Sequence, residues 1–465
     1  MDEPRPSRLI AARSSRMSVL NYVLHTALSD LWARFFCPED IQRHRRTSFV
    51  PENPTTDIMH GDLECRYTFP WFDGKTVPFW NFPWTIANQQ TKPAAYKLLF
   101  TDLNETEVTE GQKSLKKVED SFRLAAQEAQ SDDIIMLNSA CVPDLTGEDP
   151  TPFLPKHGEK TKTIYRASDG RDVAYSTTEE MIKKSLDKEK DFSPQSRTVN
   201  LVGYPGGKAR EELISLLNQV GISVSACVVP SLGFEPLRLA RKASLNIMIG
   251  HRLFEGEVKD FVAQFPVRSL TPSAPYGVKA TRLWLKTVCE AAGIDSQVAR
   301  DIWEKNWNPL KGRWENLISQ SRGKKLAFVL SPKQISQIID PRWTFAVPMF
   351  EMLSEMGFDF NFLIFAKNHP QLKLPKNRFK ISLDFFSKEE ELTRLLKNGA
   401  FDAVYSDYFF DRRISRAGKA QFSLSIFEAG PWGALRTLER FLGICKLPFY
   451  GEYGRYLGGK NSWAD

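Results

Sequence analysis

The sequence has neither a long hydrophobic run nor a cysteine-rich framework, and these two absences exclude several classes of protein. No apolar run reaches the roughly 18 residues that a membrane span needs, and the first residues contain charges without the continuous hydrophobic stretch of a secretory signal. Six cysteines in 465 residues are too few for a disulfide scaffold. We therefore expect a cytoplasmic protein whose cysteines are free thiols, metal ligands or nucleophiles.

Dense basic blocks and complete nucleotide-binding motifs are also missing. The formal net charge is only +7, and Lys and Arg are not concentrated enough to predict a nucleic-acid-binding surface. Gly206–Gly207 could hold an anion where a predicted helix begins, but the segment lacks the GxGxxG pattern. Lys208 follows as in a P-loop, yet Ala209 replaces the Ser or Thr and Val202 replaces the leading Gly. Nucleotide binding is not expected.

Apolar strands alternate with amphipathic helices in three successive parts of the chain, which begin near Tyr96, Thr198 and Lys325. Such alternation is typical of parallel sheets, and a chain of this length is expected to form several domains. The pattern predicts an α/β fold of three serial doubly wound, Rossmann-like parallel-sheet domains. The predicted divisions are an N-terminal extension at 1–60, domain I at 61–196, domain II at 197–323 and domain III at 324–465.

Two segments before domain I's first clear strand have no regular period. Residues 1–60 are polar and contain prolines, with a predicted helix over 19–36, and they either wrap a partner or are loosely ordered. Residues 66–93 combine many aromatic rings with four prolines. Such a loop buries its rings, either as a satellite core or as a subunit interface or shield over a cofactor.

Cys141 follows a predicted buried strand that begins at Ile134, so it stands at the carboxyl end of that strand. In open α/β sheets ligands bind at this end. A single cysteine in such a place is commonly a small core residue. Two further cysteines favour a ligand role instead, namely Cys37 and Cys65, the latter shortly after His60–Gly61.

These residues resemble the beta-type subunits of the nitrogenase component 1 family, which includes nitrogenase-like reductases. His60–Gly61 and Cys65 match the family's His-Gly-x-x-x-Cys pattern, and Cys141 with Gly147–Glu148–Asp149 is similar to its Cys-x-x-x-x-x-Gly-Asp-Asp pattern. Cys37 lies 28 positions before Cys65, close to the family's spacing. The 76 positions from Cys65 to Cys141 are more than the family usually has, and the 66–93 segment looks like the insertion responsible. The similarity extends from about Cys37 to a C-terminal helix beginning GPWGAL.

The resemblance implies that Cys37, Cys65 and Cys141 are metal ligands that hold half of an iron–sulfur cluster of the 8Fe-7S P-cluster type. Such clusters take soft thiolate ligands, and three thiolates cannot enclose a large cluster, so a pseudo-symmetric partner supplies the rest. The family's alpha-type subunit also anchors a catalytic cluster through a Cys and a His. Here Gly250 stands near the Cys position, and His369 in a polar turn is the only His of domain III. The chain therefore resembles the beta-type partner and carries no catalytic residue.

The implied function is electron relay from an ATP-dependent Fe protein to the catalytic cluster of an alpha-type partner, in an α2β2 heterotetramer without nucleic acid or membrane. Reductive cleavage of the carbon–sulfur bond in methylthio-alkanes is the favoured reaction. Tetrapyrrole reduction of the chlorophyllide type, nitrogenase proper and a cofactor-assembly scaffold are the alternatives within the family. A metal-free α/β transferase or epimerase, in which the cysteines are incidental, is the alternative of another class.

Overall fold

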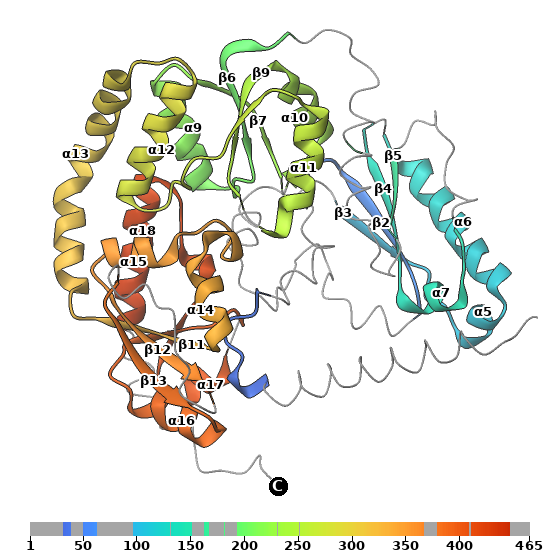
Figure 1. Ribbon diagram of the computed structural model, residues 1–465. Coiled ribbons are helices and arrows are strands. Elements are labelled where there is room, and N and C mark those ends of the chain that lie inside the picture. The colour runs from blue at the N-terminus through green and yellow to red at the C-terminus, as the bar shows by residue number, and fades with distance from the viewer. Residues whose placement is uncertain are drawn as a thin grey trace, which may run out of the picture.

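The computed structural model describes residues 31–38, 50–62, 96–130, 132–150, 162–166, 181, 193–229, 231–250, 252–366, 379–408 and 411–446. This part of the chain contains three multi-stranded sheets in succession, each with parallel strands (Figure 1), and the predicted α/β fold is confirmed. Cys65, the aromatic loop at 66–93 and most of the helix predicted over 19–36 lie outside the described residues. No helix within these ranges is long and apolar enough to cross a membrane.

The first sheet has the strand order β3-β2-β4-β5. Its elements are β2 (Thr55–His60), β3 (Tyr96–Phe100), α5 (Glu105–Thr109), α6 (Gly111–Glu128), β4 (Ile134–Ser139), α7 (Cys141–Thr146) and β5 (Lys162–Arg166). Helix α6 packs its apolar face, with Val118 and Phe122, on Ile58 and Leu137 of the sheet. Strand β2 pairs with both β3 and β4 at the centre of the sheet, although the predicted domain boundary at residue 60 leaves it in the N-terminal extension.

The second sheet has the order β10-β9-β6-β7. Its strands are β6 (Gln195–Val202), β7 (Ser223–Val228), β9 (Ala243–Met248) and β10 (Arg268–Leu270), with a short β8 (Ser231–Leu232) outside the sheet. The helices are α9 (Lys208–Gln219), α10 (Phe234–Leu239), η5 (Ala240–Lys242), η6 (Arg252–Phe254) and α11 (Glu255–Gln264). Two long helices, α12 (Val278–Ala291) and α13 (Ser296–Ser321), lead from this sheet to the next.

The third sheet has the order β13-β12-β11-β14-β15. Its strands are β11 (Lys325–Leu330), β12 (Asp359–Phe365), β13 (Ile381–Phe386), β14 (Ala403–Tyr405) and β15 (Ala420–Phe422). The helices are α14 (Pro332–Ile339), η7 (Pro341–Trp343), α15 (Met349–Glu355), α16 (Glu389–Asn398), α17 (Arg412–Arg416), η8 (Leu424–Ile426) and α18 (Gly430–Cys445). One large core cluster runs through the second and third sheets and includes residues of α12, α13 and α18.

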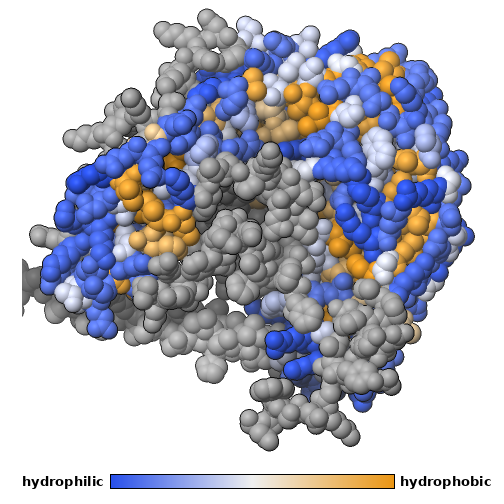
Figure 2. Space-filling model, turned by 180° about the vertical axis from the view of Figure 1, so that it is seen from behind, coloured by the Kyte–Doolittle hydropathy of each residue, from blue (hydrophilic) through white to orange (hydrophobic). Residues whose placement is uncertain are grey.

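The described N-terminal residues contact the third sheet first, then run beside the second sheet and finally enter the first sheet. This order is the reverse of the order in which the three sheets follow one another along the chain. The turn η1 (Leu31–Ala33) and the residues after it lie on the third sheet, where Asp407 N–H donates to Phe35 O at 2.9 Å. Strand β1 (Val50–Pro51) then pairs with β8 beside the second sheet, and β2 enters the first sheet. Figure 2, a view from behind, shows hydrophobic residues in separate patches with hydrophilic residues between them.

The strand order reverses beside the first strand of each sheet. The reversals fall between β2 and β4, between β6 and β9, and between β11 and β14. In open α/β sheets the ligand crevice forms at the carboxyl ends of the strands at such a point. The molecule therefore has three equivalent places in which a site could form.

Candidate functional site

The crevice of the first sheet lies where β2 ends at His60 and where α7 begins at Cys141, directly after β4. The Ala140 N–H donates to His60 O at 2.7 Å, so the two strand ends are adjacent. The main chain of Cys141 thus lies at the carboxyl edge of the sheet, and the strand predicted before it is present.

A buried polar network fills this edge. His60 is fully buried, and its Nδ1 lies 3.2 Å from Thr101 Oγ1 while its Nε2 lies 3.0 Å from Glu148 Oε2. The Ser114 hydroxyl donates to the same carboxylate oxygen. The side chain of Glu148 is only 5% exposed. A carboxylate in such a place is tolerated because neighbouring groups satisfy its lone pairs.

The contact between His60 and Glu148 joins two motifs that are far apart in the sequence. Glu148 also stabilises the end of α7, because its N–H donates to Pro143 O at 3.0 Å and its Oε1 lies 3.2 Å from Thr146 Oγ1. The network therefore fixes the helix that Cys141 opens relative to the end of β2. From there the chain continues through Asp62, which forms a parallel bridge with Leu103, toward Cys65.

The rim of this crevice is acidic and held by local contacts. Asn104 and Glu107 form a capping box that starts α5. Lys117 Nζ lies 2.7 Å from Glu107 Oε2, and this hydrogen bond, together with the one from the Asn104 N–H, lowers the pKa of Glu107 below its usual value. Asp102, between β3 and α5, has a left-handed backbone with φ of 44°, a conformation that Asp adopts more readily than most residues.

The two predicted ligands that the structure describes lie at different sheets. The main chain of Cys141 lies at the first sheet and Cys37 lies on the third sheet beside Asp407, while Cys65 is outside the described residues. Within the described ranges no three His, Cys, Asp or Glu side chains form a group that could hold a metal ion. Cysteine is the residue type that iron–sulfur clusters take as ligand, and the further predicted ligand Cys65 lies outside the described residues.

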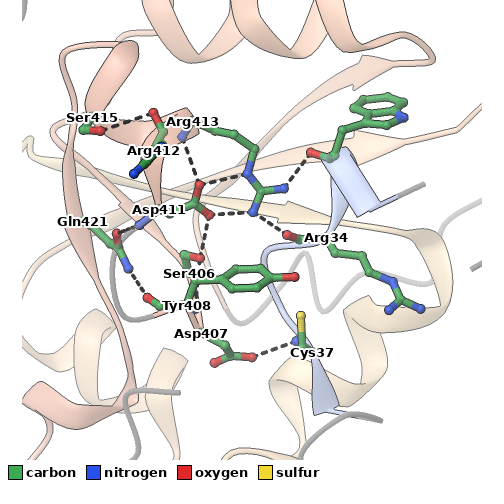
Figure 3. Close-up of polar contacts among 11 residues, drawn as sticks. Arg34, Cys37, Ser406, Asp407, Tyr408, Asp411, Arg412, Arg413, Ser415 and Gln421 are labelled. Atoms are coloured by element: carbon green, nitrogen blue, oxygen red, sulfur yellow. Dashed lines mark hydrogen bonds and ion pairs between the residues drawn. The ribbon is translucent and has the colours of Figure 1, made fainter. Parts of the chain in front are cut away.

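The crevice of the third sheet is filled by the chain itself. The Cys37 N–H donates to Asp407 Oδ2 at 2.7 Å, and the same carboxylate accepts a hydrogen bond from the Tyr405 hydroxyl (Figure 3 shows Cys37 and Asp407). Burial raises the pKa of Tyr405 well above its usual value, and the charge of Asp407 adds to this effect. The side chain of Cys37 is 4% exposed.

The three cysteines outside the motifs lie in packed surroundings. Burial raises the pKa of Cys289 to about 11 and that of Cys445 to about 12, and it also raises the pKa of Cys227. Metal ligands and nucleophiles are thiolates. Cys289 is buried and Cys227 and Cys445 are partly buried against the same core, and their raised pKa values favour the protonated thiol over the thiolate.

Sequence reasoning missed four side chains that build the two crevices. Thr101 and Asp407 come one and two residues after the ends of β3 and β14, and a search of strand ends would have found them. Ser114 and Arg413 lie on helices and have no such signal. Their roles depend on partners 34 or more positions away in the sequence.

Comparisons with known proteins agree on one family. The family model described as "Nitrogenase component 1 type Oxidoreductase" matches residues 59–424. The solved structure titled "Nitrogenase Cp1 at pH 5" superposes with a TM-score of 0.60 at 14% identity, covering 90% of this chain and 89% of that chain. "Nitrogenase Cp1 at pH 6.5" gives the same TM-score and identity and covers 90% of each chain. A search of curated protein sequences found no match. At this identity the structural likeness shows the fold.

Proposed function

Because this chain belongs to the nitrogenase component 1 type oxidoreductase family, we propose that it is the beta-type subunit of a nitrogenase-like reductase. It holds half of an electron-relay iron–sulfur cluster of the 8Fe-7S type, shared with an alpha-type partner. The cluster, when bound, accepts electrons from an ATP-dependent Fe protein and passes them to a catalytic cluster in the partner. The complex is a cytoplasmic α2β2 heterotetramer.

The observation that carries this proposal is the contact between His60 and Glu148 at 3.0 Å. It links the end of β2, which precedes Cys65 in the sequence by five residues, with the segment that begins at Cys141, so the described neighbours of both predicted ligands meet at one edge of the sheet. Buried hydrogen bonds of this kind hold ligand-bearing loops in a fixed geometry, which tunes a metal centre. Cys37 stays a predicted third ligand, and it would reach this edge only if residues 31–38 left the third sheet.

The filled crevice of the third sheet supports the beta-type role. Phe35 and Phe36 are fully buried there, and Asp407 binds the main chain at Phe35 and Cys37. A crevice that holds protein cannot hold a second, catalytic cluster at the same place. In our proposal that cluster belongs to the alpha-type partner.

The proposed reaction of the complex is reductive cleavage of the carbon–sulfur bond in methylthio-alkanes, and its support is the sequence resemblance. The Fe protein supplies two electrons for each cleavage, and with two protons they convert the thioether into methanethiol and a hydrocarbon fragment. When the two-carbon chain carries a β-hydroxyl group, the C–O bond breaks as well, and the products are methanethiol, ethylene and water. Tetrapyrrole reduction and nitrogenase proper are the alternatives that share the same relay role.

The test is anaerobic purification of this chain co-expressed with its alpha-type partner. We expect a brown complex that contains iron and acid-labile sulfide. With the Fe protein and ATP, we expect it to release ethylene from a suitable thioether. Parallel assays with acetylene, dinitrogen and a pigment precursor distinguish the reductases. A colourless complex without iron that nevertheless turns over a non-redox substrate would contradict the relay role and favour the transferase or epimerase.

A further inference from the structure

Residues Trp32–Cys37 lie across the carboxyl edge of the third sheet without joining it as a strand. Arg413 on α17 reaches two of their main-chain oxygens, with Nη1 2.7 Å from Trp32 O and Nη2 2.6 Å from Arg34 O. Figure 3 shows the guanidinium between these carbonyls and Asp411. One side chain therefore binds two alternate carbonyls of the segment, one within the turn η1 and one directly after it.

Two further side chains bind the main chain of the same segment. Asp407 accepts from the Cys37 N–H at 2.7 Å, and its own N–H donates to Phe35 O at 2.9 Å. Gln334 on α14 donates from Nε2 to Phe36 O at 2.8 Å. These contacts come from both sides of the strand-order reversal, since Gln334 follows β11 and Asp407 follows β14. They hold the segment in the crevice where a ligand would bind.

Aromatic side chains anchor the segment between these contacts. Phe35 and Phe36 are both 0% exposed. The Arg413 guanidinium lies 3.7 Å from the centre of the Phe35 ring, and the Trp32 ring lies 5.2 Å from that of Phe365 in an edge-on arrangement. Buried aromatic anchors combined with main-chain hydrogen bonds are the usual means by which a protein binds a short peptide.

The residues that receive the segment are held in place by contacts of their own. The guanidinium of Arg413 is paired with Asp411 at 2.6 Å, and Asp411 accepts a hydrogen bond from the Ser406 hydroxyl at 2.8 Å. The Asp411 N–H in turn donates to Gln421 on β15 at 2.8 Å. This network belongs to the third sheet alone, so the binding surface is preorganised and loses little freedom when the segment binds.

We propose that Trp32–Cys37 is a docking peptide and that the carboxyl edge of the third sheet is its receptor. The interaction is strong enough to hold without the covalent tether at 39–49. Docking fixes residues Trp32–Cys37 on the third sheet, upstream of the pairing of β1 with β8 and of the entry of β2 into the first sheet. It also determines whether Cys37 is buried on the third sheet or free to act elsewhere. The proposal does not depend on the proposed function.

The test uses the full chain with a protease site inserted between residues 38 and 50. After cleavage under native conditions, the N-terminal fragment should co-elute with the body in size-exclusion chromatography. An excess of a synthetic peptide of residues 31–38 should displace it. A fragment that separates from a still-folded body directly after cleavage would overturn the proposal, and so would a retained fragment that the peptide never displaces.

Arg413→Lys and Arg412→Lys form a matched pair of variants. Lys at 413 keeps a positive charge beside Asp411 but cannot reach two carbonyls at once, so fragment retention should weaken by about tenfold or more. Arg412 is exposed, and its variant should behave as the unaltered chain. In the uncut protein, Cys37 should be alkylated faster in Arg413→Lys than in Arg412→Lys. Equal retention together with equal alkylation in the two variants would refute the docking interaction.

Discussion

The carboxyl edges of the first and third sheets occupy equivalent places in the topology but are used differently. At the first sheet, the contact between His60 and Glu148 joins the end of β2 to the residues after α7, the helix that begins at Cys141. At the third sheet, Asp407 and Arg413 bind a segment more than 300 positions away in the sequence. The same architecture thus forms two different edges. The edge of the first sheet is followed by a cysteine, and the edge of the third sheet is covered by residues from the N-terminal part of the chain. What a crevice contains, and not its topology, decides its use.

The second sheet adds a third solution. Gly203 follows β6 with φ of 85°, and a Cβ atom there would lie 2.9 Å from Ile249 O, after β9. The Ile249 N–H donates to Val202 O at 3.0 Å. The main chains of the two strand ends therefore approach closely at the strand-order reversal, which only a glycine permits.

The largest predicted effect tests the difference between the first and third sheets, and it is the loss of cluster iron when a predicted cysteine ligand is substituted. In the heteromeric complex, Cys141→Ala and Cys65→Ala should lose the relay cluster and all reductase-driven activity, because alanine has no soft donor atom to replace the thiolate. Cys37→Ala should lose only part of the iron, since its segment also binds the third sheet. Iron per complex is the measurement, and full iron in Cys141→Ala would refute the ligand assignment.

A second prediction tests the buried network of the first sheet. Glu148→Ala should lower the free energy of unfolding by about 3 kcal/mol, because it leaves His60 and Ser114 without their buried partner. Urea denaturation measures this loss. The control is Glu119→Ala, which removes an exposed pair with Arg123 on α6 and should cost less than about 0.5 kcal/mol. Similar losses in the two variants would mean that the buried network stabilises the protein no more than an exposed ion pair does.

A third prediction concerns the pH dependence of the third-sheet edge. Tyr405→Phe should cost about 1 kcal/mol at neutral pH through the lost hydrogen bond to Asp407. The folded-state pKa of Tyr405 is raised above its usual value of 10.0 by burial. Its contribution to stability is therefore complete below about pH 10 and decreases as the pH rises toward the folded-state pKa. Denaturation at pH 8 and pH 11 should show the difference between the two proteins shrinking, and a constant difference would contradict this.

The smallest effects are expected at the cysteines outside both edges. Cys289→Ala and Cys445→Ala should each cost about 1 kcal/mol of stability by leaving a small cavity. Neither should change the iron content of the complex. Iron loss comparable to that of Cys141→Ala would show that the two edges do not differ from the rest of the chain in metal binding.

Elements with a strong local pattern were predicted well from the sequence. Strands β3 and β11 begin at Tyr96 and Lys325, where two of the three alternating parts were predicted to begin. The side chain of Asp295 caps α13 by accepting a hydrogen bond from the Gln297 N–H at 2.8 Å. A capping residue lies next to the helix in the sequence, so the start of a helix can be predicted locally. Cys141 was also located at a strand end from local sequence, whereas the strand that ends at His60 was not predicted.

Elements that depend on distant partners were not predicted. Strand β2 contains the polar residues Thr55, Asp57 and His60, so its sequence does not have the apolar pattern expected of a strand at the centre of a parallel sheet. Its polar side chains are buried because partners from other elements satisfy them, as Asn138 does for Asp57. Strand β5, within the predicted domain I, was likewise not predicted, and its pairing with β4 holds it in the sheet.

The sequence by itself determined the α/β class, the three successive units and the cysteine motifs, because hydrophobic period and residue spacing are local properties. Only the tertiary structure decided that Glu148 bonds to His60 and that Phe35–Cys37 fills the third sheet's crevice. A buried polar group must find a partner wherever the fold provides one. The choice of that partner is made across the whole chain and leaves no local signal.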